Sequence, residues 1–137
     1  ISSDVYSVTS YNELAREGQE VARYNMLHPE AEQKVPYISQ VITADNGPAI
    51  SATDYVKSYS DQLRAFINTD YRVLGTDGFG RSDGRARLRH HFEVDRYYVT
   101  VNALKALADQ GAIKPKLVTE AIKKYNIDVN KLNPLKA

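Results

Sequence analysis

The sequence contains no cysteine, and this absence excludes a disulfide scaffold, a thiolate metal site and a cysteine nucleophile. No apolar run approaches the roughly 20 residues that a membrane-spanning helix needs, so we expect no membrane partner. Neither sign of charge dominates, because the net charge is only +1, and we expect no nucleic-acid partner on that ground. The chain starts at Ile1 without a methionine or a signal-like pattern, and we expect a fragment of a longer polypeptide.

The residues that are present indicate a folded domain with an uneven distribution of charge. Hydrophobic residues make up 42% and charged residues 26% of the 137 residues, and these fractions are typical of a single globular domain. Residues 1–50 contain seven acidic and three basic residues, a net charge of −4, whereas residues 81–137 contain twelve basic and six acidic residues, a net charge of +6. This polarity indicates either two solvated faces or a surface that orients a partner.

Patterns in the first part of the chain predict a strand followed by a helix. Residues 4–9 (DVYSVT) alternate apolar and small polar side chains, which predicts a strand. Ser10 and Glu13 have the spacing of a capping box, and apolar residues at helical spacing then predict a helix over residues 11–27. The helix is expected to end before Pro29, because the residue that precedes a proline is disfavoured in the α region.

The rest of the chain alternates between short strands and helices. The predicted elements are strands at 49–53 and 71–75, helices at 54–67, from about 82 to 92, at 96–110 and from 115, and an apolar run at 35–42 that fits either a strand or a helical turn. Asp95, Gly111 and Pro115 suit the ends of the last two helices. This order favours an α/β fold with a mainly parallel sheet and helices on its faces, in a single domain over residues 1–137.

The loop after the predicted strand at 71–75 (TDGFGRSDG) raises the question of phosphate binding. Gly78, Gly80 and Gly84 lie between a predicted strand and a predicted helix, which is the context of a dinucleotide-binding loop. Their spacing is one residue longer than the dinucleotide fingerprint, and the position about 20 residues on, where an acidic ribose ligand is expected, falls near Tyr98 in a predicted helix. We therefore favour a structural turn with glycines at positive φ, and nucleotide binding is the alternative.

Basic residues are concentrated after this loop. Arg81, Arg85 and Arg89 recur every four residues, and guanidinium groups bind carboxylates and phosphates in a bidentate manner. These residues and His90 are candidate contacts for an acidic partner, with internal pairing or solvation as the alternative. His90 is followed directly by a second histidine, and adjacent residues on a helix point about 100° apart, which does not suit a metal site. No residue is assigned to catalysis, cofactor binding or metal binding.

Longer runs of the sequence carry a family resemblance: VYSVTSYNELAREGQE, NMLHPE, VPYISQV, ATDYVKSYSDQLRAFI, YRVLGTDGFGRSD, LRHHFEVD and the ending NIDVNKLNPLKA. They resemble the carboxyl-terminal region of the bacterial, homodimeric, thiamine-diphosphate-dependent pyruvate dehydrogenase components (decarboxylating, acetyl-transferring). The resemblance covers essentially the whole chain. It implies a transketolase-type C-terminal domain, a three-layer sandwich with a mainly parallel, mixed sheet, of which this chain lacks the first strand and helix.

The resemblance also implies the function of the parent chain. Thiamine diphosphate attacks pyruvate, carbon dioxide leaves, and the acetyl unit passes to a lipoyl group of the dihydrolipoyl acetyltransferase component, with the cofactor acting as electron sink. The implied partners are this acetyltransferase, the rest of the parent chain and its homodimer mate, and the implied location is the cytoplasm.

The cofactor motif of the family does not carry over to these residues. In the family, Gly-Asp-Gly followed downstream by Asn binds Mg²⁺ and the diphosphate, whereas here Asp77-Gly78 lacks the preceding glycine. We therefore expect thiamine diphosphate and Mg²⁺ to be bound by the parent enzyme and not by this chain. We also expect the chain alone to be inactive and to act through structure and interaction.

Overall fold

The computed structural model describes residues 1–137, apart from the side chain of Asn46. Its elements follow in the order α1 Tyr11–Leu27, α2 Tyr37–Val41, η1 Ala44–Asn46, β1 Ala49–Ala52, α3 Lys57–Asp61, η2 Arg64–Phe66, β2 Tyr71–Leu74, α4 Arg85–His91, α5 Arg96–Asp109, α6 Pro115–Lys124 and η3 Pro134–Lys136, where η denotes a 3₁₀ turn. The ambiguous apolar run at 35–42 therefore contains a helix, α2, and no strand.

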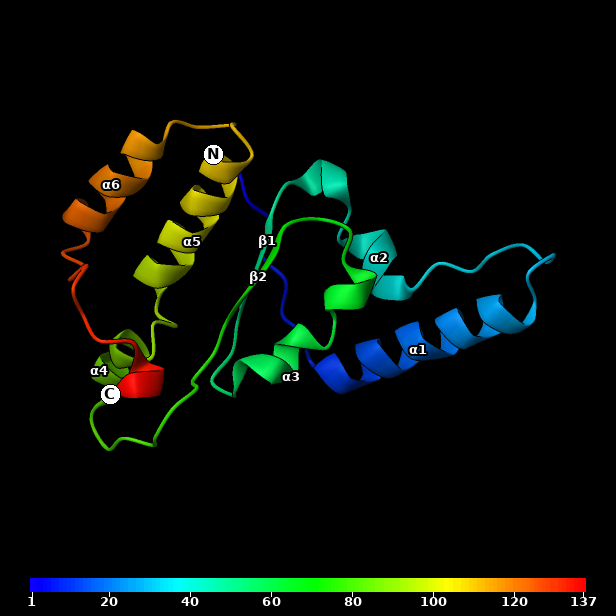
Figure 1. Ribbon diagram of the computed structural model, residues 1–137, viewed down its shortest axis with the longest axis horizontal. Helices are drawn as coiled ribbons and strands as arrows, with labels where there is room; N and C mark the ends of the chain where they lie inside the picture. The colour runs from blue at the N-terminus through cyan, green and yellow to red at the C-terminus, as the bar shows by residue number, and fades with distance from the viewer.

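A two-stranded parallel sheet lies between two groups of helices. β1 pairs with β2 from Ala49 opposite Tyr71 to Ala52 opposite Leu74, and α3 lies in the long connection that a parallel pair requires. Figure 1 shows α5 and α6 on one side of the sheet and α1, α2 and α3 on the other. The prediction of an α/β fold with parallel strands is confirmed.

The strand predicted over residues 4–9 is not formed. Val5 and Tyr6 in this segment are 92% and 50% exposed. Alternating apolar and polar side chains describe a strand with one buried face, but a strand also needs a neighbour for its backbone N–H and C=O groups. Across the described part of the chain only β1 and β2 form such a ladder, so the sheet is smaller than the mixed sheet that the resemblance implies.

The first helix begins and ends where the sequence predicts. The Ser10 hydroxyl accepts a hydrogen bond from the Glu13 N–H at 3.2 Å, which satisfies one of the free N–H groups of the first turn. The Glu13 carboxylate pairs with Arg16 and does not complete the capping box. α1 stops at Leu27, and His28 has a non-helical φ of −128°.

The helix predicted over residues 54–67 is short and interrupted, because the chain before α3 is held in another conformation. The Thr53 hydroxyl accepts a hydrogen bond from the Tyr55 N–H at 3.1 Å, and Asp77 Oδ1 accepts one from the Lys57 N–H at 3.0 Å. The first bond favours a turn at Thr53 over a helix, and the second satisfies a free N–H group of the first turn of α3, which begins at Lys57. Tyr55, expected on the inward face of the helix, lies before this start and is 68% exposed.

The helices α4, α5 and α6 end in the same motif. The residue after each helix cap is left-handed: Glu93 (φ 62°), Gly111 (φ 76°) and Asn126 (φ 54°). The N–H of the following residue then reaches back over the last turn, from Val94 to the Arg89 carbonyl (2.9 Å), from Ala112 to Leu107 (2.9 Å) and from Ile127 to Ile122 (3.1 Å). These are Schellman motifs, which satisfy carbonyl groups of the last turn.

Two apolar groups and one charged network hold the elements together. The core of the first group joins α1, α2, β2 and the segment after α3, and it consists of Ala15, Ile38, Leu63, Ile67 and Tyr71. The second lies on α5 and α6 and includes Tyr98, Ala106, Val118 and Ala121. The Tyr71 hydroxyl donates to the Ser60 carbonyl at 2.9 Å, so the polar atom of this buried ring is satisfied.

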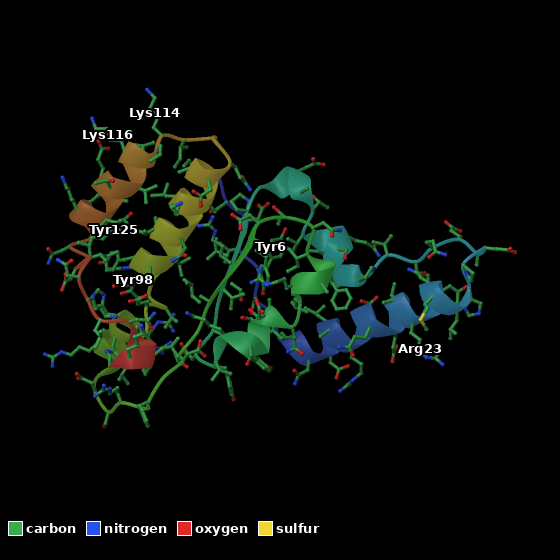
Figure 2. The ribbon with its side chains drawn as sticks, viewed as in Figure 1. Tyr6, Arg23, Tyr98, Lys114, Lys116 and Tyr125 are labelled. Atoms are coloured by element: carbon green, nitrogen blue, oxygen red, sulfur yellow. The ribbon has the colours of Figure 1, made fainter. Side chains whose placement is uncertain are left out.

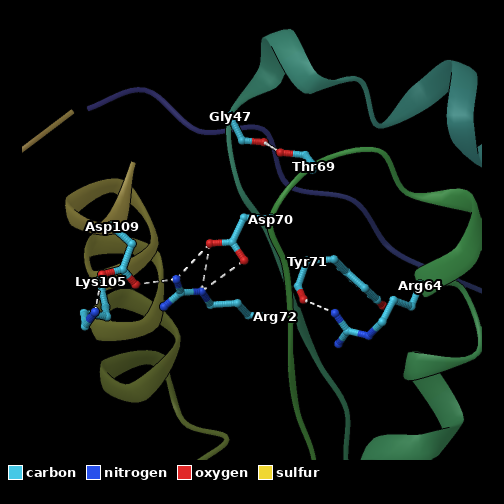
Figure 3. A network of polar contacts seen from close by, with 8 residues as sticks. All are labelled: Gly47, Arg64, Thr69, Asp70, Tyr71, Arg72, Lys105 and Asp109. Atoms are coloured by element: carbon cyan, nitrogen blue, oxygen red, sulfur yellow. Dashed lines mark hydrogen bonds and ion pairs between the residues drawn. The ribbon is translucent and has the colours of Figure 1, made fainter. Parts of the chain in front are cut away.

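The charged network ties β2 to α5 (Figure 3). Arg72 Nη2 donates to Asp70 Oδ2 at 2.8 Å and to Asp109 Oδ2 at 2.7 Å. Asp109 also pairs with Lys105, one turn earlier on α5. Hydrogen bonds from Lys105 and Arg72 lower the pKa of the Asp109 carboxyl group, so its charge is favoured in the folded state.

Candidate functional site

The glycine loop, residues 75–84, joins β2 to α4 and packs against its own chain along its first half. The Thr76 N–H donates to the Tyr55 carbonyl at 2.8 Å. The next residue, Asp77, holds the Lys57 N–H through its carboxylate. This part of the loop therefore fixes the segment that leads into α3.

Gly78 is the glycine that the backbone geometry requires. Its φ is +105°, and a Cβ atom at this position would lie 2.5 Å from the Pro134 carbonyl oxygen. Glycine adopts such a conformation without steric cost and allows η3 to approach this closely. The third glycine of a dinucleotide fingerprint packs a helix against a strand, whereas Gly84 faces open space. Gly75 at the start of the loop is constrained as well, since a Cβ atom there would lie 2.7 Å from the Tyr55 carbonyl oxygen. Internal packing thus accounts for both constrained glycines of the loop, and the geometry does not favour nucleotide binding.

The helix after the loop begins later than the sequence predicts. The pattern predicts a start near Ser82, but α4 begins at Arg85 with Gly84 as its N-cap residue and no side-chain cap. The Asp83 carboxylate accepts a hydrogen bond from the adjacent Gly84 N–H at 2.6 Å. This local bond favours a turn at Asp83 over the first turn of a helix.

Two of the four predicted partner contacts face their own chain. Arg89 donates from Nη1 to Asp54 Oδ1 at 2.8 Å and from Nη2 to the Val94 carbonyl at 2.9 Å. His90 Nδ1 lies 2.9 Å from Asp95 Oδ2. Arg89 therefore joins α4 to the segment before α3, and His90 supports the cap of α5, so we assign structural roles to both.

The other two predicted contacts, Arg81 and Arg85, are exposed. Neither makes a hydrogen bond or an ion pair with any residue that the structure describes. Arg87 lies beside them, with its side chain 83% exposed and its Nη1 3.7 Å from Asp83 Oδ2. We call Arg81, Arg85 and Arg87 the arginine patch. These three side chains are free to bind an anion or carboxylates of a partner.

A shallow hollow opens beside the arginine patch. Its lining consists of Gly80, Arg81, Ser82, Asp83, Arg87, Leu88 and His91. His91 Nε2 is buried and has no hydrogen-bond partner among the described residues. Buried polar atoms are normally hydrogen-bonded, so this unpaired nitrogen is an exception among the described residues.

Phe79 is a surface feature that the sequence reasoning missed. The side chain is 81% exposed at the tip of the glycine loop, which Figure 1 shows at the outer edge of the molecule between β2 and α4. The signal was present in the sequence, because a phenylalanine between two glycines of a polar loop has no neighbouring apolar residue to pack against.

The described residues form neither a metal-binding cluster nor a membrane-spanning helix. They contain no group of three or more His, Asp or Glu side chains placed to hold a metal ion. None of their helices has the length and apolar character needed to cross a bilayer.

Comparison with known proteins identifies relatives of the chain. The family model of the transketolase-like TK C-terminal domain matches residues 1–95. The chain is 57% identical to the pyruvate dehydrogenase E1 component of Escherichia coli strain K12 over 135 residues, which are 98% of the chain and 15% of the relative. It is 54% identical to the component of the same name from Haemophilus influenzae over 138 residues, covering 100% of the chain and 15% of the relative.

A third relative extends this similarity to another group of bacteria. The pyruvate dehydrogenase E1 component of Cupriavidus necator is 53% identical over 135 residues, again 98% of the chain and 15% of the relative. The chain thus spans about 15% of the length of the curated relatives that it matches. Since the family model covers more than half of its residues, the chain belongs to the family of transketolase-like TK C-terminal domains.

Proposed function

We propose that this chain is the carboxyl-terminal domain of a bacterial pyruvate dehydrogenase E1 component. The observation that carries the proposal is the 57% identity to the Escherichia coli component over 98% of the chain. The full polypeptide decarboxylates pyruvate with thiamine diphosphate and transfers the acetyl unit to lipoyl groups.

The residues of this chain do not fit the cofactor, and we assign its binding to other parts of the full polypeptide. Asp77 and Gly78 give the nearest match to a motif for Mg²⁺ and diphosphate, but the Asp77 carboxylate already accepts the Lys57 N–H. The constrained backbone of Gly78 packs against Pro134. Thiamine diphosphate supplies the electron sink when bound, and we derive no step of the reaction through the residues described here.

Within the full polypeptide the chain acts as a structural and interaction domain. Exposed apolar residues occur along the chain, and those in the amino-terminal segment and towards the carboxyl terminus include Ile1, Val5, Val129, Leu132 and Leu135. Exposed apolar patches are typical of contact surfaces. They support contacts with the rest of the parent chain and with a homodimer mate. Because the family resemblance implies both, we also propose a cytoplasmic location and the dihydrolipoyl acetyltransferase component as a partner.

A chimaeric enzyme tests this function. The matching 135 residues of the Escherichia coli relative are replaced by this chain, and thiamine-diphosphate-dependent decarboxylation of pyruvate is measured together with acetyl transfer to a lipoyl domain. We expect both rates to stay within the order of magnitude of the unmodified component, since the substituted domain contributes no group to the reacting centre.

Two further proteins control the experiment. The relative without its matching segment should lose activity, because the helices and sheet that support the other domains are absent. A chimaera in which only Arg23 of this chain, an exposed residue without a partner among the described residues, is changed to Ala should behave as the parent chimaera. A dimeric, folded chimaera without decarboxylation would contradict the proposal.

A further inference from the structure

We propose that the arginine patch and Phe79 form a docking site for an acidic segment of a partner protein. A docking site on this surface goes beyond the proposed enzyme activity, which does not determine where a partner binds. Arg16, Arg64, Arg72 and Arg89 each pair with a carboxylate at short distance. The patch differs, because Arg81 and Arg85 have no partner among the described residues and Arg87 has only a distant one.

Phe79 adds an apolar anchor to this charge. The residue follows Gly78, which is packed on Pro134, and the preceding Asp77 is tied to the segment before α3. The loop therefore presents the ring from a fixed base. Aromatic and arginine side chains together are enriched among the residues that contribute most to binding at protein interfaces.

The charges favour a protein partner over a nucleic acid. Nucleic-acid affinity comes from neutralising many phosphates. The arginine patch has only three cations, and the Asp83 carboxylate lies beside one of them. The net charge of the chain is only +1. Carboxylates of Asp and Glu side chains match guanidinium groups in a bidentate geometry. The surrounding residues 81–137 carry a net charge of +6, which attracts an acidic protein surface at a distance.

The hollow beside the patch offers a place for one of the partner's carboxylates. Arg81, Arg87 and His91 line it. A carboxylate that enters the hollow meets the guanidinium groups of Arg81 and Arg87, which bind carboxylates through paired N–H donors.

Binding of a short peptide tests the proposal on the full-length protein that carries this chain. The probe is a fluorescein-labelled peptide of Glu and Asp residues with one central Leu, followed by fluorescence anisotropy at low salt. The double variant Arg81→Glu/Arg85→Glu should weaken binding by roughly tenfold and flatten its salt dependence, because charges at an interface act over about a Debye length. Phe79→Ala should weaken binding without changing the salt dependence.

Matched control variants distinguish an effect of the arginine patch and Phe79 from an effect of any exposed arginine or apolar side chain. Arg23 lies on α1, remote from α4 (Figure 2), and is exposed without a partner among the described residues. The variant Arg23→Glu should leave peptide binding nearly unchanged. Met26→Ala, which removes another exposed apolar side chain (70% exposed) from the same helix, is the control for Phe79→Ala.

Four results would overturn the proposal. The first is peptide binding that the patch variants do not change, or that Arg23→Glu weakens equally. The second is tighter binding of a single-stranded oligonucleotide or of inorganic pyrophosphate than of the acidic peptide through the same arginines. The third is self-association of the protein that Arg81→Glu/Arg85→Glu abolishes. The fourth is a lowered melting temperature of this double variant, which would place the patch inside the folded protein.

Discussion

Left-handed residues at three helix ends show how single positions set the stability of the fold. Of the three, only Gly111 is a glycine, and a Cβ atom there would meet nothing within 4 Å. The cost of a side chain at this position is therefore conformational and not steric. Glu93 and Asn126 already bear that cost, which for most residues is of the order of 1 to 2 kcal/mol.

The variant Gly111→Ala should lower the free energy of unfolding by about 1 kcal/mol. Urea denaturation monitored by circular dichroism measures the change. Gly80→Ala is the control, since Gly80 also faces open space but is not left-handed. We expect it to leave stability unchanged or to raise it slightly, because alanine restricts the unfolded chain. Equal losses in the two variants would contradict this account of α5.

The hydroxyl group of Tyr98 makes stability depend on pH in the alkaline range. Burial of the ring raises the pKa of Tyr98 to about 12, and the nearby carboxylates of Glu93, Asp95 and Asp128 add to the shift. An unfolded tyrosine titrates near pH 10. Because the folded pKa is the higher one, this stabilisation is complete below about pH 10 and is lost as the pH rises towards about 12.

Replacing Tyr98 by Phe should therefore weaken this pH dependence. Between about pH 9 and pH 11 the free energy of unfolding should fall by about 1 kcal/mol less in Tyr98→Phe than in the parent protein. Urea denaturation at both pH values provides the measurement. Tyr6→Phe is the control, since the Tyr6 side chain (Figure 2) lies in the amino-terminal segment and is half exposed. An equal fall in the free energy of unfolding for Tyr98→Phe and the parent protein over this pH range would contradict a role for Tyr98.

At the scale of elements, the contact between β2 and α5 depends on the charged network of Arg72. The Arg72 side chain is 23% exposed, and its guanidinium group bridges Asp70 and Asp109. A partly buried, multivalent pair is expected to contribute more than an isolated surface pair.

A double-mutant cycle with Arg72→Met and Asp109→Asn should give a measurable favourable coupling free energy at low salt. The coupling should shrink at high salt, since the pair is only partly shielded from solvent. The pair of Lys116 and Glu120 on α6, at 3.8 Å with side chains 83% and 56% exposed, is the control and should couple more weakly. A coupling at Arg72 no larger than this control would mean that apolar packing alone holds α5 to the sheet.

Elements whose ends depend on neighbouring residues were predictable from the sequence. α1 has a cap at Ser10 and a stop before Pro29, and both signals act within one helical turn. The same holds for the cap of α5, where the Asp95 carboxylate accepts from the N–H groups of Tyr97 and Tyr98.

Elements whose form depends on distant residues were not predictable. The pattern of residues 4–9 predicts a strand, but no property of those six residues supplies the neighbour that a strand requires. The start of α3 is held by the Asp77 carboxylate, which accepts the N–H of Lys57 from 20 positions away. The arginine spacing predicted basic side chains after the loop, yet it did not show that Arg89 turns towards Asp54, 35 positions away.

At the scale of the whole molecule, the proposed function assigns the chemistry to polypeptide outside this chain. In the glycine loop, Gly78 packs against Pro134 and the Asp77 carboxylate accepts the Lys57 N–H, so both residues are engaged within the chain. The three cationic groups of the arginine patch lie on the outer surface, around α4 and the loop before it. The relatives that it matches are more than six times longer, which leaves ample polypeptide for cofactor and substrate sites.

Calorimetric titration of thiamine diphosphate in the presence of Mg²⁺ tests this central claim most directly. The 137-residue chain is titrated after circular dichroism has shown its helices to be formed. The account predicts no heat beyond that of dilution, because the described residues hold no cluster of three or more His, Asp or Glu side chains for Mg²⁺, and Gly78 of the glycine loop already packs against Pro134. Saturable binding in the micromolar range would contradict it, since the cofactor would then be held by these residues alone.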